Sequence, residues 1–187
     1  MKAYYSDHFV LPLPSGHRFP MEKYSLLRAQ VAKIEGIELF EAPLASDIDL
    51  ARAHSLSYIE KVTNGTLTDS ELREIGFPWT TLMVERSKRS AGATMQACIT
   101  ALKDGVAVNL AGGTHHAYRD KGSGFCVFND AVVAARRLQS QQKMQIAIID
   151  LDVHQGNGTA SICKGDSSIF TLSIHGEKNF PFRKETS

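Results

Sequence analysis

Short, almost wholly apolar runs alternate along this chain with longer amphipathic segments, and this alternation restricts the fold more than any other feature. Residues 146–149 and 106–108 contain no charged side chain. Such runs are typical of strands that are covered on both faces. Strands separated by helices predict an α/β domain built on a parallel sheet.

The expected elements follow from this pattern. Strands are expected at residues 2–5, 37–42, 106–111, 145–153 and 168–174, and helices at 21–34, 47–54, 58–62, 82–103 and 131–143. Ser46 and Asp130 stand at expected helix N-caps, and Gly105 follows the long central helix, where glycine is favoured. The polar segment 64–79, which contains Pro78, is predicted to be a surface excursion within one domain spanning residues 1–187.

Composition restricts the partners. Lys and Arg number 21 against 20 Asp and Glu, a formal charge of +1, so neither direct nucleic-acid binding nor attraction to an anionic membrane is expected. The apolar runs are too short to span a membrane, and the N-terminus lacks the apolar region of a signal peptide, which predicts a cytoplasmic protein. Cys98, Cys126 and Cys163 form no C-x-x-C pair and are expected to be reduced thiols.

Polar residues that follow two of the apolar runs are the candidates for chemistry, because open α/β sheets bind ligands beyond the carboxyl ends of their strands. The sequence reads GGTHHA at residues 112–117 and DLDVHQGNG at residues 150–158. If the strand continued past Asp150, the side-chain period of two would turn Asp150, Asp152 and His154 to one face. Three ionisable groups on one face are costly to desolvate without a cation.

Zinc suits these side chains. A catalytic zinc ion typically takes three protein ligands and a water, and histidine and aspartate are common ligands. Asp152 and His154 provide two, so the third must come from elsewhere. Each pattern also has a simpler interpretation, since a lone Asp-x-Asp is often a turn or helix cap and adjacent histidines are often structural. Their joint occurrence after two buried strands favours a site.

Three motifs resemble those of the histone deacetylase / acetylpolyamine amidohydrolase superfamily. They are GGTHHA at 112–117, GSGFCVFND at 122–130 and DLDVHQGNGT at 150–159. The segments SGHRFPMEKYSLL at 15–27 and NFPFRKETS at 179–187 resemble the bacterial and class IV-like branch. The resemblance implies a three-layer, arginase/deacetylase-like fold with a parallel sheet, of which this chain is the N-terminal and central part. In that fold the last two strands insert between the third and fourth, so the sheet is expected to lack its centre.

The resemblance also implies roles for single residues. Asp152 and His154 correspond to zinc ligands, and the third ligand, an aspartate, would lie beyond Ser187. His115 and His116 correspond to the tandem active-site histidines. Asp150 would be the partner of His115, and Asn157 the partner of His116, where some branches have aspartate.

Further implied sites concern the substrate and a second ion. Gly124 and Phe125 correspond to the acyl-lysine channel, although Phe125 has a core aromatic as its alternative. A potassium ion would be held by Asp150, Ser173, the carbonyl of Ile174 and two carbonyls near the zinc ligands, those of Asp152 and His154. A serine that is simply hydrogen-bonded within the fold is the alternative for Ser173.

The implied activity is zinc-dependent hydrolysis of an acetyl or other acyl group from lysine in a protein, or from a small acetylated amine, with neutral His116 as base. The family's oxyanion tyrosine has no counterpart in this chain. One alternative is therefore an inactive fragment or non-catalytic binding module of the same fold. A second, weaker one is an arginase-like ureohydrolase with two manganese ions. Substrate and oligomeric state are left open.

Overall fold

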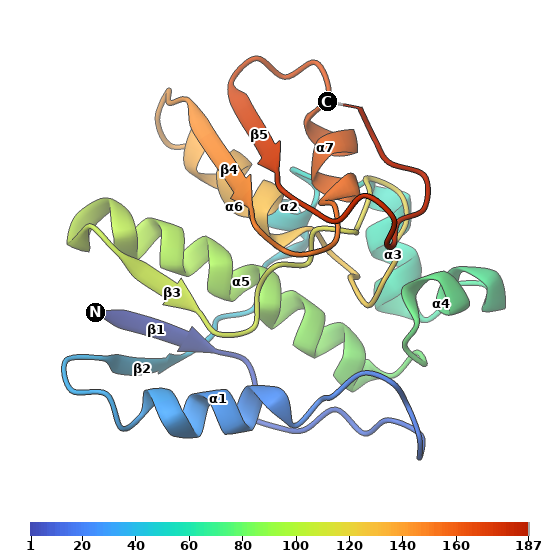
Figure 1. Ribbon diagram of the computed structural model, residues 1–187, viewed down its shortest axis with the longest axis horizontal. Helices are drawn as coiled ribbons and strands as arrows, with labels where there is room; N and C mark the ends of the chain where they lie inside the picture. Colours follow the sequence, from blue (N-terminus) through green and yellow to red (C-terminus); the bar gives the residue numbers. More distant parts are fainter. Residues whose placement is uncertain (187) are drawn as a thin grey trace.

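The structure is a computed structural model that describes residues 1–186 and contains two separate parallel sheets with helices around them (Figure 1). The strands are β1 (Lys2–Tyr5), β2 (Glu38–Glu41), β3 (Ala107–Asn109), β4 (Ile146–Asp150) and β5 (Ile169–Ser173). The helices are α1 (Lys23–Val31), α2 (Asp47–Leu50), α3 (Leu56–Asn64), α4 (Asp69–Ile75), α5 (Thr81–Asp104), α6 (Asp130–Gln139) and α7 (Asn157–Cys163). The α/β class and the parallel strand pairing predicted from the sequence are confirmed.

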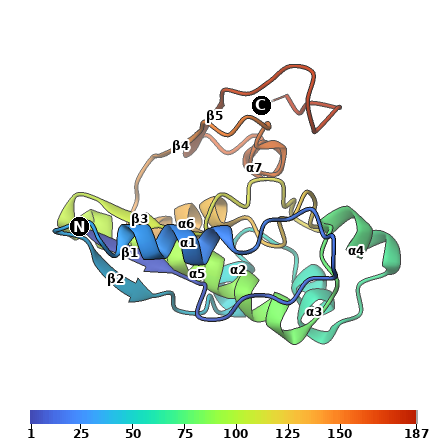
Figure 2. The same cartoon turned by 60° about the horizontal axis from the view of Figure 1, so that its bottom comes forward.

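The sheets have the orders β2-β1-β3 and β4-β5. In register, Ala3 pairs with Leu39 and Val108, and Ile148 pairs with Thr171. Among the residues that the structure describes, no strand pairs with the free edges of β3 and β4. Figures 1 and 2 show the β4-β5 pair standing apart from the three-stranded sheet. The single sheet expected from the sequence is therefore present as two separate parallel sheets among the described residues.

Helices rather than strands join the two sheets. Helix α5 packs against β1 and β3 on one side and against α6 on the other, and α7 lies between α6 and β5. The core beneath them is apolar and includes Leu50, Tyr58, Met83, Val132 and Val133, all of them at most 2% exposed. No helix among the described residues is long and apolar enough to cross a membrane.

The β4-β5 sheet is covered on one face only. Ile148 and Ile169 pack into the core, whereas the side chains that alternate with them point outward. Ile149 is 52% exposed, Phe170 63% and Leu172 41%. Residues 146–149 of β4 were predicted to be covered on two faces, so this exposed apolar face marks where the described part of the chain provides no covering layer.

Two helices were missed in the sequence. The segment 64–79, predicted to be a surface excursion, contains α4, which begins with a capping box between Thr68 and Glu71. The T-x-x-E pattern of residues 68–71 is typical of a helix N-terminus and could have indicated α4. Helix α7 begins at Asn157, and its next two residues, Gly158 and Thr159, have low helix propensity. Its seven residues are also too few to show a helical period of apolar side chains.

Two boundaries also differ from expectation. Strand β4 ends at Asp150, so Asp152 and His154 lie in a loop and not on a continued strand face. The N-cap of α6 is Asn129, whose side chain accepts from the backbone N–H of Val132; Asp130, predicted to be the cap, has another use. Ser46 and Gly105 occupy their predicted cap positions.

Candidate active site

The loop that carries the two histidines is held by Asp130. Its carboxylate accepts hydrogen bonds from the backbone N–H groups of Gly113 and Thr114, at 3.0 and 2.8 Å, and from the hydroxyls of Thr114 and Thr94. Asp130 is 2% exposed, and a buried carboxylate is stable only with such donors. The loop after β3 is therefore fixed to the first turn of α6 and to α5.

His115 contacts the end of β4. Its Nδ1 lies 2.6 Å from Oδ2 of Asp150, and both side chains are largely shielded from solvent. The other carboxylate oxygen of Asp150 accepts from the backbone N–H of Asp152. The structure thus brings together two residues 35 positions apart, the pair that the resemblance implied.

His116 is the more deeply buried histidine. Its Nδ1 lies 2.7 Å from Oδ1 of Asn157, the first residue of α7, and its ring centroid lies 4.1 Å from that of His115. Burial lowers the pKa of His116 from its usual 6.5 to about 4, although the hydrogen bond to Asn157 opposes the shift. At neutral pH the imidazole is uncharged.

Asp152 and His154 face the same region from the loop after β4. Oδ1 of Asp152 lies 3.0 Å from Nδ1 of His154 and 3.9 Å from Nε2 of His115. Their side chains are 51% and 43% exposed, so their donor atoms are accessible. One carboxylate oxygen and one imidazole nitrogen side by side suit a zinc ion. No group of three His, Cys, Asp or Glu side chains that would hold a metal occurs among residues 1–186, so Asp152 and His154 would need a further ligand to hold one.

Gly124 and Phe125 lie against the end of α4. Their backbone N–H groups donate to the carbonyls of Glu74 and Ile75, at 3.1 and 2.7 Å, which are free because the helix ends there. Both residues have positive φ, +54° for Gly124 and +66° for Phe125. A Cβ at Gly124 would lie 2.8 Å from the ring of His116. The overlooked helix α4 thus sets the position of this loop beside the histidine.

Phe125 is both part of an aromatic cluster in the core and a lining residue of a cavity, the two alternatives expected from the sequence. Its ring packs against those of Phe19 and Phe77, at centroid distances of 5.1 and 5.3 Å, and it also lines a cavity of about 1230 Å³. The two tandem histidines, Asp150, Asp152, His154 and Gly124 line the same cavity. Seven of the eight residues proposed for catalysis, zinc binding and the acyl channel, all but Asn157, therefore border one cavity.

Phe180 is a lining residue that the sequence did not reveal. Its ring stands edge-on to His116, with centroids 4.9 Å apart, and lies 6.3 Å from the ring of His154. It comes from the segment after β5, which has no periodic pattern. Only its place in the NFPFRKETS segment distinguished it, and no chemistry singled it out.

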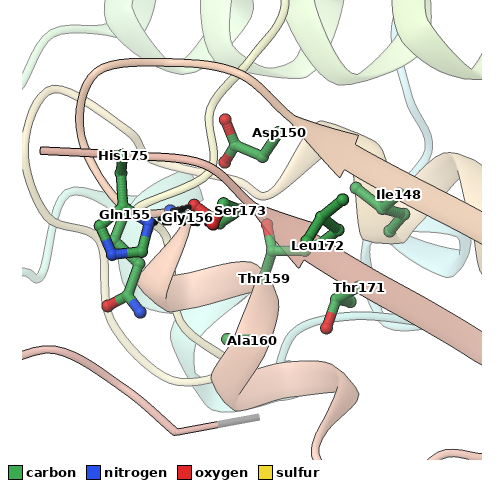
Figure 3. A pocket seen from close by; sticks show the side chains of 10 residues that line it. All are labelled: Ile148, Asp150, Gln155, Gly156, Thr159, Ala160, Thr171, Leu172, Ser173 and His175. Carbon is green, nitrogen blue, oxygen red and sulfur yellow. Dashed lines mark hydrogen bonds between the residues drawn. The ribbon is translucent and has the colours of Figure 1, made fainter.

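Two of the residues proposed for potassium border a smaller cavity of about 170 Å³, drawn in Figure 3, whereas Ile174, Asp152 and His154 are not among its lining residues. Asp150 and Ser173 line it together with Gln155 and His175. The hydroxyl of Ser173 lies 2.9 Å from Nδ1 of His175 and accepts from the backbone N–H of Gly156. A hydrogen-bonded serine, the simpler interpretation, therefore describes Ser173 here, while its oxygen still faces the cavity.

Comparison with known proteins places the chain in a family. The histone deacetylase domain model matches residues 17–187. An uncharacterized protein of Picosynechococcus is 41% identical over 98% of this chain and 62% of its own length. The acetoin utilization protein AcuC of Bacillus subtilis is 31% identical over 85% of this chain and 43% of its own. Histone deacetylase 8 of Xenopus tropicalis is 31% identical over 83% and 42%.

Solved structures agree. An HDAC homolog complexed with SAHA superposes with a TM-score of 0.81 at 28% identity, covering 98% of this chain and 53% of the homolog. An HDAC homolog from Aquifex aeolicus gives 0.80 at 28% identity, over 97% and 52%. The chain thus spans about half the length of these structures and 42 to 62% of the relatives named above. It belongs to the histone deacetylase family.

Proposed function

We propose that this chain supplies the tandem histidines, with their hydrogen-bond partners, and two zinc ligands of a deacetylase. The enzyme hydrolyses the acyl amide of a lysine side chain or of a small acetylated amine. One observation carries the proposal. His115 and His116 lie ring against ring, each with its own oxygen partner, on the cavity that Asp152 and His154 also line. Such paired, differently partnered histidines suit proton transfer.

Asp152 and His154 would hold the zinc ion, with a third protein ligand from outside the described residues. When bound, zinc supplies polarisation of the amide carbonyl and of a water molecule. The proposal agrees with the donor chemistry of the two side chains and with their exposure to the cavity.

His116 is proposed as the base. Its pKa of about 4 keeps it neutral, and a proton on Nδ1, donated to Asn157, leaves the Nε2 lone pair available to accept a proton from water. His115, paired with the carboxylate of Asp150, would stabilise developing positive charge and help protonate the departing amine. A neutral amide next to His116 and a carboxylate next to His115 give the two rings different proton affinities.

Gly124, Phe125 and Phe180 would form the wall along the acyl chain. An apolar wall with a glycine, which takes no side-chain space, suits a slender alkyl amide; Gly124 and Phe180 lie against His116, and Phe125 lines the same cavity. Asp150, Ser173 and the carbonyl of Ile174 would hold potassium beside the small cavity, together with the carbonyls of Asp152 and His154.

The second candidate is a non-catalytic module, favoured by the presence of two metal ligands and not three among the described residues. The hydroxyl of Tyr118, the tyrosine nearest the histidines in sequence, donates its proton to Glu185, so that proton is not directed at an oxyanion. An arginase-like role would need two metal ions, and one metal per chain would exclude it.

The deciding experiment compares residues 1–187 with the full-length protein that contains them. Zinc content and hydrolysis of an acetyl-lysine peptide and of an acetylated polyamine are measured for both. Zinc near one equivalent and hydrolysis in the full-length protein, with little of either in residues 1–187, supports the proposal. A full-length protein with zinc but no hydrolysis of either substrate would favour the binding module.

A further inference from the structure

A chain of hydrogen bonds extends behind His116 to a carboxylate. Asn157 accepts from His116 through Oδ1, at 2.7 Å, and its Nδ2 donates to the hydroxyl of Tyr118 at 2.8 Å. The Tyr118 hydroxyl in turn lies 3.3 Å from Oε1 of Glu185 and donates to it. Four side chains from three separate parts of the sequence thus form one connected series.

The carboxylate at the end gives this series a direction. An ionised carboxylate accepts hydrogen bonds and donates none, so the single Tyr118 proton is directed to Glu185. The tyrosine oxygen must then accept from Asn157, which places Nδ2 of the amide toward Tyr118 and Oδ1 toward His116. Because Oδ1 only accepts, Nδ1 of His116 must carry the proton.

The opposite direction would disable the base. If the Asn157 amide were turned over, its NH₂ group would face His116, and Nδ1 would have to accept. The proton of the neutral ring would then move to Nε2, and Nε2 would have no lone pair for a water proton. An asparagine by itself is symmetric in shape and permits both orientations, so something beyond it must select one.

We propose that Tyr118 and Glu185 are positioning residues that fix the orientation of the Asn157 amide and thereby hold His116 in the Nδ1–H tautomer. This rests on the proposed function only in giving His116 the part of base; the tautomer itself is a property of the protein without substrate. The carboxylate is three hydrogen bonds away from the imidazole, so it sets the direction of the series without placing a negative charge beside His116.

Hydrogen bonds to the backbones of Glu185 and Tyr118 hold these two residues in place for their contact. Gln155, which is 7% exposed, holds the backbone of Glu185 at both ends: its Nε2 donates to the Glu185 carbonyl at 3.0 Å, and its Oε1 accepts from the Glu185 N–H at 2.8 Å. The backbone of Tyr118 is fixed by His54, whose Nδ1 donates to the Tyr118 carbonyl at 2.9 Å. Both ends of the Tyr118–Glu185 contact are therefore anchored.

Direct observation of the ring nitrogens tests the proposal. The full-length protein is labelled with ¹⁵N-histidine, and long-range ¹H–¹⁵N correlation spectra distinguish protonated from bare nitrogen in His116. The parent should show Nδ1 protonated and Nε2 bare. Glu185→Gln keeps the shape but can donate as well as accept, and Tyr118→Phe removes the hydroxyl. Each should shift His116 toward a mixture of tautomers, whereas Tyr5→Phe, in β1, should not.

Kinetics provides the second readout. In both variants kcat should fall roughly tenfold with KM little changed, and the double variant should be no slower than Tyr118→Phe because both act through one series of bonds. A parent with Nε2 protonated, or unchanged spectra in both variants, would overturn the proposal. If the spectra change as expected but neither parent nor variants hydrolyse acyl amides, the proposed function fails and the tautomer assignment stands.

Discussion

A Cβ atom on residue 156 would collide with Oδ2 of Asp150, the oxygen that contacts His115. Gly156 has φ −71°, which any residue can adopt, so space and not backbone conformation requires glycine at this position. The turn between the loop after β4 and α7 is thus closed onto the Asp150 carboxylate, and the His115–Asp150 pair depends on the absence of a side chain at residue 156.

Gly156→Ala should therefore displace Asp150 and weaken its contact with His115. We expect a loss of roughly 1–3 kcal/mol in the free energy of unfolding and reduced hydrolysis in the full-length protein. Gly165→Ala is the matched control, because its Cβ meets nothing within 4 Å and only its φ of +79° is unfavourable. Urea unfolding compares the two, and unchanged activity in Gly156→Ala would contradict the role given to the contact.

His116→Ala in the full-length protein should remove most hydrolysis and leave zinc bound. A general base contributes roughly a hundred- to ten-thousandfold in rate, and His116 is proposed as base and not as ligand. Metal content and steady-state rates are measured on the same preparation. Near-normal turnover would exclude His116 from proton transfer.

Asp152→Ala and His154→Ala should each lose zinc itself, because a site reduced from three protein ligands to two holds metal poorly. Asp47→Ala, a carboxylate exposed on α2 and paired with Lys88, is the control and should bind zinc like the parent. Metal analysis after dialysis gives the answer. Equal zinc in all three variants and the parent would mean that the metal is held elsewhere.

Acid should destabilise the fold through His54. Burial lowers its pKa from 6.5 to about 4, and its Nε2 accepts from the backbone N–H of Asn129, which a protonated ring cannot do. The unfolded chain therefore binds more protons between these pH values, so stability is complete above about pH 6.5 and declines as pH falls toward 4, by roughly 3 kcal/mol.

Urea unfolding of the full-length protein between pH 7 and pH 4 measures this slope. His54→Asn keeps a polar side chain but does not titrate, so its slope should be smaller than that of the parent. A slope remains because the pKa of His116 is lowered in the same direction. Identical slopes in the variant and the parent would show that His54 does not titrate as expected.

Residues 1–187 alone should self-associate through the exposed face of β4-β5 and the free strand edges. Replacing Phe170 and Leu172 with lysine should reduce the association, whereas Leu26→Lys, on exposed α1, should not. Light scattering and sedimentation velocity measure the change. A monodisperse monomer of the parent chain would contradict the expectation.

Every strand lies within a few residues of its expected range, and the clearest signal was the apolar run at residues 146–149 of β4. The pairing of Asp150 with His115, and of Asn157 with His116, was implied by the family resemblance and not by the spacing of these residues. The continued strand through His154 was wrong because side-chain to backbone hydrogen bonds at Asp150 and Asp152 turn the chain there.

Other parts of the site had no local signal. Tyr118 and Glu185 are 67 residues apart, and nothing in either neighbourhood indicates their contact. Helix α4 carried a capping box, but its role in holding Phe125 depends on two carbonyls at its end and on a tertiary meeting that no periodicity encodes. Motifs within a few residues, such as a capping box, can be recognised in a sequence, whereas contacts between residues far apart in the chain cannot.

The unpaired edges of β3 and β4 bear on the order in which the domain forms during synthesis. A ribosome adding about 5–20 residues per second needs on the order of 10–40 s for residues 1–187. During that interval α5 and α6 can already hold the histidine loop and the β4 loop in place, since their contacts need no later residue. The unpaired edges of β3 and β4 are then exposed at the same time, and an exposed strand edge is prone to mispairing with another chain.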